Sequence, residues 1–253
     1  MSAANPATRQ RLDELLVGRG LFQTRSRARD AIERGTVAVS GKVETKPGRV
    51  VEQGAEIVVD DPARDYVSRS ALKLVAALDH FALDVRGAAA LDVGASTGGF
   101  TQVLLERGAA SVIALDVGRD QLHGTLRADP RVLVIEGLNA RDLTIDHLGG
   151  VRPRIIVADV SFISLKLALP PALALAAPGA SAALLVKPQF EAGREAIGKG
   201  GLLRDQALGP RIAEDLSAWL DVQPGWRSLG VIPSPIEGGD SNREFLLGGK
   251  RDR

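Results

Sequence analysis

Residues 91–100 of this 253-residue chain read LDVGASTGGF. An aliphatic run here passes into a glycine-rich turn and then into a helical pattern, which predicts a buried strand, a tight turn and a helix. Glycines let the backbone approach a ligand closely, and amide groups at the start of a helix suit polar or anionic ligand atoms. Asp116 ends the next predicted strand, 22 positions after Gly94, where a carboxylate can accept hydrogen bonds from a ribose. The pattern therefore predicts a ligand that contains a nucleoside.

Three ligand classes compete for this turn. The spacing Gly94-x-Ser96-x-Gly98 matches the nucleophile elbow of hydrolases, but that mechanism needs a histidine late in the chain, and the last one is His147. A dinucleotide dehydrogenase prefers glycine at position 96, because its pyrophosphate needs a close approach to the backbone. S-adenosylmethionine has no pyrophosphate, and it suits a turn with one acid before it, Asp92, and another after the next strand. We favour S-adenosylmethionine. The candidate cofactor-binding residues of the turn are Asp92, Gly94, Ser96, Thr97, Gly98, Gly99 and Phe100, with Asp116 beyond it.

Short aliphatic segments alternate with helical ones on both sides of the turn. The predicted strands are residues 88–93, 111–116, 132–135, 155–159, 181–186 and 245–247, and residues 248–253 read as a loose polar tail. Such alternation is typical of an α/β fold, here a Rossmann-like, doubly wound and mostly parallel sheet that binds its ligand at the carboxyl ends of the strands. Asn139, Asp159 and Lys187 each follow a predicted strand. Asn139 then either meets the adenine or caps a helix, Asp159 either serves the site or forms a turn, and Lys187 either serves the site or extends into solvent.

The composition excludes several kinds of protein. The chain has no cysteine and three widely spaced histidines, so we expect neither a metal site nor disulfides, and a reducing cytoplasm suits it. Residues 167–186 carry no charge and approach the length of a bilayer span, but Pro170, Pro171, Pro178 and Gly179 interrupt them. We expect a short buried helix, a turn and a strand there, and no membrane span.

The first fifty residues carry an excess of positive charge. They hold ten Lys and Arg against five Asp and Glu, whereas the rest of the chain holds 22 against 26. The apolar spacing predicts two short helices and strands at 37–39, 43 and 57–59, which together make a small α+β domain over residues 9–60. Polar residues 61–67 read as a linker, and a second domain spans 68–248. A basic domain of this kind favours RNA as its partner, although a solvated charged surface is the alternative.

This N-terminal part resembles the alpha-L RNA-binding motif. The resemblance rests on RLD at 11–13, SRA at 26–28, IERG at 32–35, Val37, Val39 and GK at 41–42. It implies that basic side chains dock on structured RNA, mostly through phosphates. The candidate RNA-binding residues are Arg11, Arg25, Arg27, Arg29, Arg34 and Lys42.

Nearly the whole chain resembles the haemolysin-A (TlyA) family of rRNA methyltransferases, whose second domain is of the FtsJ type. The motifs that carry the resemblance are YVSRSALK at 66–73, DVGASTGGF at 92–100, ADVSF at 158–162, VKPQFE at 186–191 and NREF at 242–245. The chain departs from the family at Ser70, where glycine is common. The resemblance implies a ribose 2′-O-methyltransferase that uses S-adenosylmethionine and acts on ribosomal RNA within ribosomal subunits, with cytidine as the expected nucleoside.

The resemblance also implies a catalytic tetrad of Lys73, Asp159, Lys187 and Glu244. In this hypothesis Lys187 is the base that takes the proton of the ribose hydroxyl, and the neighbouring Lys73 and partial burial favour its neutral amine. Asp159 and Glu244 position the two amines, and Asp159 also belongs to the cofactor site. The alternatives are a ribosome-binding or assembly factor without activity and a membrane-active haemolysin. The sequence leaves the target nucleotide, the ribosomal subunit and the oligomeric state open.

Overall fold

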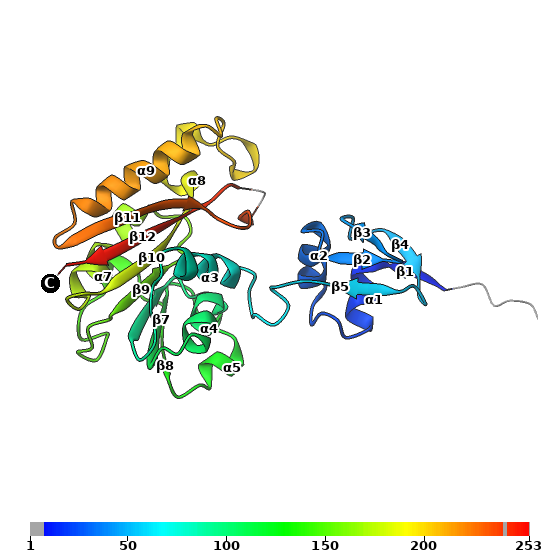
Figure 1. Cartoon of the computed structure of the whole chain (residues 1–253), viewed down its shortest axis with the longest axis horizontal. Coiled ribbons are helices and arrows are strands. Elements are labelled where there is room, and N and C mark those ends of the chain that lie inside the picture. Colours follow the sequence, from blue (N-terminus) through cyan, green and yellow to red (C-terminus); the bar gives the residue numbers. More distant parts are fainter. Residues whose placement is uncertain (1–7, 240–241, 253) are drawn as a thin grey trace, which may run out of the picture. The chain divides into compact units, whose positions relative to one another are not determined.

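Two units make up the computed structural model, which describes residues 8–239 and 242–252 (Figure 1). The chain divides between Asp65 and Tyr66. The N-terminal unit contains β1 (Arg9–Arg11), α1 (Leu12–Gly18), α2 (Arg25–Glu33), β2 (Val37–Val39), β3 (Lys42–Glu44), β4 (Val50–Glu52) and β5 (Ile57–Val59). The strands form a three-stranded sheet in the order β3-β2-β5 and a separate pair of β1 with β4.

The two helices of this unit supply most of its core. Leu12, Leu15 and Leu16 on α1 are buried, as the i, i+3, i+4 spacing predicts, and they pack with Ala28, Ala31 and Ile32 of α2. Thr24 caps α2, because its Oγ1 accepts a hydrogen bond from the amide of Arg27. The sequence did not reveal the β1–β4 pair, whose strands are only three residues long.

The polar segment that follows β5 packs against α2 in its first half. Asp61 accepts two hydrogen bonds of 2.8 Å from the guanidinium of Arg34. Arg27 donates to the carbonyl groups of Ala63 and Arg64, at 3.3 and 2.8 Å. The residues up to Arg64 are therefore held by the N-terminal unit.

The C-terminal unit is a seven-stranded sheet in the order β11-β12-β10-β9-β6-β7-β8. Its strands are β6 (Ala89–Val93), β7 (Ser111–Asp116), β8 (Val132–Glu136), β9 (Ile155–Ala158), β10 (Ser181–Val186), β11 (Trp226–Pro233) and β12 (Phe245–Arg251). Neighbouring strands from β10 to β8 are parallel, and β12 pairs antiparallel with both β10 and β11. The predicted doubly wound, mostly parallel sheet is confirmed.

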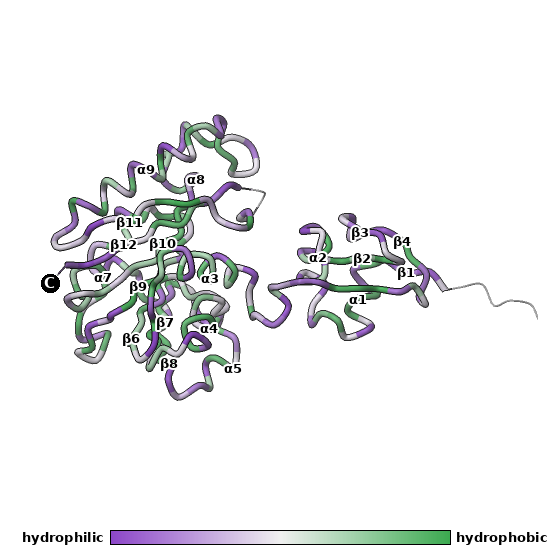
Figure 2. Tube along the Cα trace, viewed as in Figure 1, coloured by the Kyte–Doolittle hydropathy of each residue, from purple (hydrophilic) through white to green (hydrophobic). Residues whose placement is uncertain are grey.

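Helices cover both faces of this sheet. The unit contains α3 (Ala71–His80), α4 (Gly99–Glu106), α5 (Gly124–Arg127), α6 (Leu165–Ala168), α7 (Pro170–Leu175), α8 (Pro188–Glu191) and α9 (Leu208–Asp221), and the 3₁₀ turns η1 (Ala140–Asp142), η2 (Arg194–Ala196) and η3 (Lys199–Gly201). Alternate residues of β10 enter different cores: Leu184 packs with residues of α6, α7 and α9, and Leu185 packs with residues of α3, α4 and α5. Along α9, hydrophobic and hydrophilic residues follow one another in turn, as expected of a helix with one face on the sheet (Figure 2).

The prediction that residues 248–253 form a loose polar tail is wrong for residues 248–251, because β12 continues to Arg251. Two glycines hid this strand from the sequence pattern. A Cβ atom at Gly248 would lie 2.7 Å from the ring of Phe81, which packs directly on the backbone there. A Cβ atom at Gly249 would lie 2.7 Å from Cδ2 of Leu220, a flexible end that would have to move.

The uncharged stretch of residues 167–186 contains the end of α6, the helix α7 and the strand β10, as predicted. Pro170 and Pro171 begin α7, where a proline loses no helical hydrogen bond. Within the described residues, no helix combines the length and the apolarity needed to cross a membrane.

The strand order changes direction between β6 and β9. From β6 the chain continues to β7 and β8 on one side, and it then returns to β9 on the other. The carboxyl ends of two such strands leave a crevice in doubly wound sheets, because the connections leave them in opposite directions. Gly94 follows β6 and Asp159 follows β9, so the two predicted site residues flank this point.

Candidate active site

The glycine turn after β6 packs directly on the end of β9. Gly94 has a φ of +85°, and a Cβ atom there would lie 2.6 Å from the carbonyl oxygen of Asp159. Ser96 also adopts a left-handed φ, of +47°, which is uncommon for a residue other than glycine. Gly98 is the N-cap of α4, Gly99 is the first residue of that helix, and Phe100 is buried behind it. The sequence of the turn thus fixes a backbone path that few other residues could follow.

Asp116 holds the turn in place. Its carboxylate accepts a hydrogen bond of 2.7 Å from the amide of Ser96 and another of 2.7 Å from the amide of Gly118. Each carboxylate oxygen has a second lone pair, so these bonds leave acceptor capacity for a ligand. Asp116 therefore connects the end of β7 to the glycine turn.

Asp92 lies beneath the turn and is fully buried. Thr101 donates a hydrogen bond of 2.7 Å to Oδ2, whereas Oδ1 has no hydrogen-bond partner among the described residues. Burial raises the pKa of Asp92 to about 7, although the bond from Thr101 acts in the opposite direction. The position thus combines a titratable group with an unsatisfied polar atom at the base of the turn.

A cavity of about 100 Å³ opens between the turn and the start of α3. It is lined by Ser68, Ser70, Gly94, Ala95, Ser96, Thr97, Phe100 and Asp159. The hydroxyl groups of Ser68 and Ser70 lie 3.0 Å apart at its wall. Ser70, the position at which the chain departs from the family pattern, therefore contributes a hydroxyl group to the cavity.

Two lysine–carboxylate pairs lie at the same edge of the sheet. Lys187 Nζ is 2.6 Å from Asp159 Oδ1 and donates a hydrogen bond of 2.8 Å to Ser161 Oγ. Lys73, on the first turn of α3, forms an ion pair with Glu244, and both of these side chains are buried. The four predicted tetrad residues are thus arranged as two ion pairs.

The strand register explains this arrangement. Val93 pairs with Ala158, and Ala158 pairs with Leu184, so Gly94 and Asp159 leave adjacent strands side by side. On the other side of β10, Val186 pairs with Phe245, which brings Lys187 next to Glu244 along the sheet edge. Residues from four separate sequence motifs therefore meet where the strands end.

Asn139 caps a helical turn in the structure, which is one of the two roles predicted for it. Its Oδ1 accepts a hydrogen bond of 3.1 Å from the amide of Arg141 and thereby caps η1. Its side chain is half-buried beyond the end of β8.

Phe162 is the most unusual residue near the site, and the sequence pattern did not single it out. Its side chain is 91% exposed and its backbone has a left-handed φ of +64°. The ring lies 5.0 Å from that of Phe190, and Lys187 Nζ lies 6.0 Å from the centre of the Phe190 ring. Phe162 follows Asp159 by three residues and contacts Phe190, which also lies close to Lys187, so it is a candidate for contact with a ligand. Its presence in the ADVSF motif was the available signal.

Several of the predicted RNA-binding residues have partners inside the N-terminal unit. Arg11 and Arg25 both bind the fully buried carboxylate of Asp13, with Arg25 Nε 2.9 Å from Oδ2. Arg34 is largely buried between Asp30 and Asp61, and burial opposes but does not cancel the rise in its pKa that these two carboxylates cause.

Arg29 and Lys42 are more accessible. Arg29 is exposed on α2, and its ion pair with Glu33 is long, at 4.0 Å. Lys42 is exposed at the start of β3. Of the predicted residues, these two are the most available to an external phosphate.

Sequence comparison identifies two families in the chain. The profile of the FtsJ-like methyltransferase family matches residues 66–251, and that of the S4 domain matches residues 10–57. The S4 match covers the part of the chain that resembles the alpha-L motif.

Relatives align over nearly the full length. The 16S/23S rRNA (cytidine-2′-O)-methyltransferase TlyA of Mycobacterium tuberculosis is 46% identical over 95% of this chain and 90% of its own length. Hemolysin A of Brachyspira hyodysenteriae is 39% identical over 93% of this chain and 98% of its own. A solved hemolysin-type structure from Streptococcus thermophilus has 40% identity and a TM-score of 0.74, with 97% of this chain and 90% of that one covered. The chain therefore belongs to the TlyA family, in which an S4 domain precedes an FtsJ-like methyltransferase domain.

Proposed function

We propose that this protein transfers a methyl group from S-adenosylmethionine to the 2′-hydroxyl group of a cytidine in ribosomal RNA. The observation that carries the proposal is the pair of lysine–carboxylate contacts at the sheet edge, next to a glycine turn that borders a cavity. The family membership supports the reaction class, and a relative named for cytidine-2′-O methylation of 16S and 23S rRNA supports the substrate. An enzyme that acts on ribosomal subunits works in the cytoplasm.

The residues around the turn suit this cofactor. The cavity lies between Gly94 and Ser70, and Asp116 at the end of the next strand retains acceptor capacity for ribose hydroxyl groups. Burial raises the pKa of Asp92 to about 7, and a positively charged ligand near the turn would favour the ionised form of this carboxyl group, whose Oδ1 is unsatisfied. When bound, S-adenosylmethionine supplies a methyl group that is activated on a positively charged sulfur. We assign its binding to the residues of the turn together with Asp116 and Asp159, and to the side-chain amide nitrogen of Asn139, because the Oδ1 of Asn139 already caps η1.

Lys187 acts as the base in this proposal. Its Nζ, in the neutral form, would accept the proton of the 2′-hydroxyl group. The oxygen would take the methyl group that bound S-adenosylmethionine supplies, and the sulfur would keep the electrons of the broken C–S bond and leave as S-adenosylhomocysteine. Asp159 and Ser161 hold the amine at the carboxyl edge of the sheet, at 2.6 and 2.8 Å. Because the methyl group is already activated, alignment of the hydroxyl group contributes a large part of the rate enhancement.

Lys73 and Glu244 form the second half of the site. The ion pair between them is buried, so each side chain fixes the position of the other. In our proposal Lys73 orients the ribose, and Glu244 positions Lys73. Glu244 also neutralises the charge of Lys73, which weakens the influence on Lys187 that the sequence led us to expect.

Phe162 completes the proposed acceptor site. An exposed aromatic ring beside the base offers a stacking surface for an unpaired nucleobase, and stacking on aromatic side chains is a common way for proteins to hold flipped or single-stranded bases. The S4 domain then supplies docking on structured RNA through phosphate contacts.

Substitution of Lys187 tests this proposal. Lys187→Ala should lower methyl transfer to undermodified ribosomal subunits by about 10²–10⁴-fold, because a positioned base is removed. Lys187→Arg should be almost as harmful, because arginine keeps the charge and the pair with Asp159 but does not lose its proton. Both variants should bind S-adenosylhomocysteine like the wild type. Near-full activity of Lys187→Arg would exclude Lys187 as the base. A wild-type protein that binds subunits and cofactor but labels no ribose would instead be a binding or assembly factor.

A further inference from the structure

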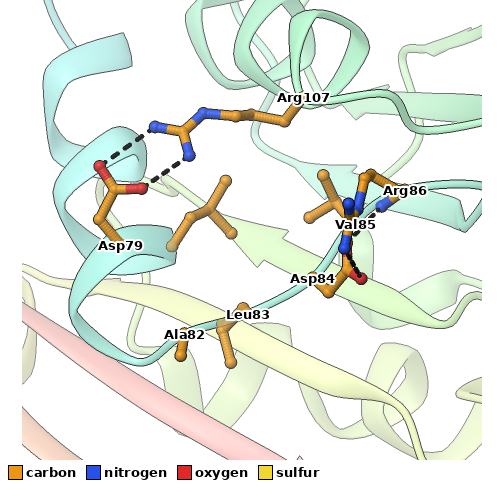
Figure 3. Close-up of a pocket in the computed structure, with 8 residues that line it drawn as sticks. Asp79, Ala82, Leu83, Asp84, Val85, Arg86 and Arg107 are labelled. Atoms are coloured by element: carbon orange, nitrogen blue, oxygen red, sulfur yellow. Dashed lines mark hydrogen bonds and ion pairs between the residues drawn. The ribbon is translucent and has the colours of Figure 1, made fainter.

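Two adjoining pockets lie at the edge of the sheet where the parallel strands begin. The first, of about 320 Å³, is shown in Figure 3. Its charged groups are satisfied by one another: Arg107 donates two hydrogen bonds to Asp79, and Arg86 donates two to Asp84. Two cations face two anions there, so this pocket has no uncompensated charge to offer a ligand.

The second pocket is different. It has a volume of about 410 Å³ and shares Asp84 and Arg86 with the first, but it adds the cations Arg154, Arg227 and Lys250. Asp84 is the only carboxylate that lines it within the part of the chain that the structure describes. Arg86 and Asp84 compensate each other, so Arg154, Arg227 and Lys250 are the cations that have no matching carboxylate in the lining of this pocket.

The topology explains why these cations meet. Arg154 immediately precedes β9, and Ser181 begins β10. Lys250 lies opposite Ser181 on β12, and Arg227 pairs with Lys250 from β11. The basic side chains thus come from three strands or strand ends that the register places side by side.

Arg227 has an ion-pair partner outside the pocket, whereas Lys250 and Arg154 form no ion pair among the described residues. Lys250 Nζ donates to the carbonyl oxygen of Gly179 at 2.8 Å and to Ser181 Oγ at 3.1 Å, which uses two of its three N–H groups. Arg227 Nε lies 3.4 Å from Asp252, a residue that does not line the pocket. Arg154 forms no side-chain hydrogen bond or ion pair within residues 8–239 and 242–252.

We propose that this pocket, lined by Arg86, Arg154, Arg227 and Lys250, binds a phosphate group. Like charges in one concavity repel one another, and an anion there removes the repulsion and occupies the unused donors. Arginine forks and a lysine ammonium are the side chains that recognise phosphate oxygens, and the volume lies in the range of sites for small ligands.

The site is separate from the proposed reaction. Lys187 and Asp159 lie at the carboxyl ends of the strands, whereas the pocket lies at their amino ends. Arg154 and Asp159 flank the four-residue strand β9, so their backbones are about 17 Å apart along it. The phosphate can belong to the RNA backbone or to a free phosphorylated molecule. Either source presents the same chemistry to the pocket, so the experiment has to separate them.

Pyrophosphate is a suitable probe for the full-length protein. Calorimetry at low salt should detect binding to the wild type, and Arg154→Ala should weaken it about tenfold or more, because a charge-assisted bidentate interaction is removed. Arg152→Ala is the matched control, since Arg152 is an exposed arginine two residues away that does not line the pocket. S-adenosylhomocysteine affinity should be the same in all three proteins.

A second arm measures the affinity for ribosomal subunits and the rate of methyl transfer. If the natural phosphate belongs to RNA, Arg154→Ala will weaken subunit binding more than Arg152→Ala, and pyrophosphate will compete with the subunit. If it belongs to a free molecule, subunit affinity will not change while the pyrophosphate effect remains. The proposal is wrong if the wild type binds no pyrophosphate and the two variants bind subunits equally, or if both variants lose pyrophosphate affinity to the same extent. Neither result depends on whether methyl transfer occurs.

Discussion

Gly94 occupies a position where the backbone and the neighbouring strand both require glycine. Its φ is +85°, and an added Cβ would meet the backbone of Asp159, which cannot rotate away as a side chain can. Gly94→Ala should therefore destabilise the protein and weaken cofactor binding. Gly150→Ala is the control, because φ there is +79° and a Cβ would meet nothing within 4 Å. The control should cost roughly 1 kcal/mol in urea unfolding and leave binding intact. Equal costs would mean that the contact with Asp159 is unimportant.

Asp92 should make stability depend on pH in an unusual direction. Its pKa in the folded protein is raised to about 7 by burial, above the ordinary value of 3.8. The protonated form is therefore favoured by folding, and the stability that it contributes is present below about pH 4 and is lost as the pH rises through 7. Asp92→Asn should flatten the dependence of the unfolding free energy on pH between about 4 and 7, as measured by urea denaturation at several pH values. An unchanged slope would show that Asp92 is ionised in the folded protein throughout this range.

Phe162 should contribute to RNA binding and not to folding. Its ring is 91% exposed, so Phe162→Ala should leave the melting temperature unchanged or slightly higher. If the ring stacks on a base, its removal should cost about 1–3 kcal/mol in binding or in kcat/KM for ribosomal subunits. Phe162→Tyr keeps an aromatic face and should retain most of the activity. A loss of activity in Phe162→Tyr as large as that in Phe162→Ala would contradict stacking.

At the scale of elements, the sequence predicted those strands that are buried on both faces. β7 and β10 have the predicted bounds, because their aliphatic runs end abruptly at polar or proline-containing turns. β11 was missed: it is an edge strand with a register shift between Ser228 and Gly230, and it has no continuous apolar face. Hydrophobic periodicity detects burial by a core, and an edge strand of this kind is buried too little to leave that signal.

The sequence placed the candidate residues at one edge of the sheet, but it did not predict how they pair with one another. Motif residues after each strand pointed to one edge, which is a consequence of parallel topology. The pairing of Lys73 with Glu244 joins residues 171 positions apart, and no local pattern encodes it. Asp116 was predicted to accept hydrogen bonds from a ribose. In the structure it accepts one from the amide of Ser96, because a carboxylate at a strand end meets the backbone of the neighbouring turn.

The ion pair between α3 and the start of β12 gives a prediction about these two elements. Glu244→Gln should leave the buried amine of Lys73 without its counter-charge and destabilise the protein by about 3–5 kcal/mol. The double variant Lys73→Met with Glu244→Leu replaces the pair by apolar side chains and should recover most of that stability while methyl transfer stays abolished. Urea unfolding and a transfer assay measure the two quantities. If the double variant is as unstable as Glu244→Gln, the ion pair stabilises the folded protein by more than the cost of burying its two charges.

At the scale of the whole molecule, the excess of positive charge is confined to the first fifty residues, because residues 51–65 of the N-terminal unit add five acidic residues and one arginine. The first fifty residues hold twice as many basic as acidic residues, whereas the remainder has a small acidic excess. Several of the arginines serve the fold: Arg25 binds the buried Asp13, and Arg34 joins α2 to Asp61. Net charge alone therefore overstates the number of side chains that can bind RNA.

The exposed pair Arg29 and Lys42 should account for a measurable part of subunit binding. The double variant Arg29→Ala with Lys42→Ala should lower the affinity, and each phosphate that it no longer neutralises should reduce the slope of the salt dependence by about one unit. Its melting temperature should not change, because both side chains are exposed and the one ion pair that either forms among the described residues is the long one with Glu33. Arg34→Ala should instead lower the stability of the N-terminal unit, because it removes the ion-pair partner of Asp61 in a largely buried position. Cofactor affinity should be unaffected in every variant. If the double variant binds subunits with the wild-type affinity and salt slope, docking does not depend on this surface of the S4 domain.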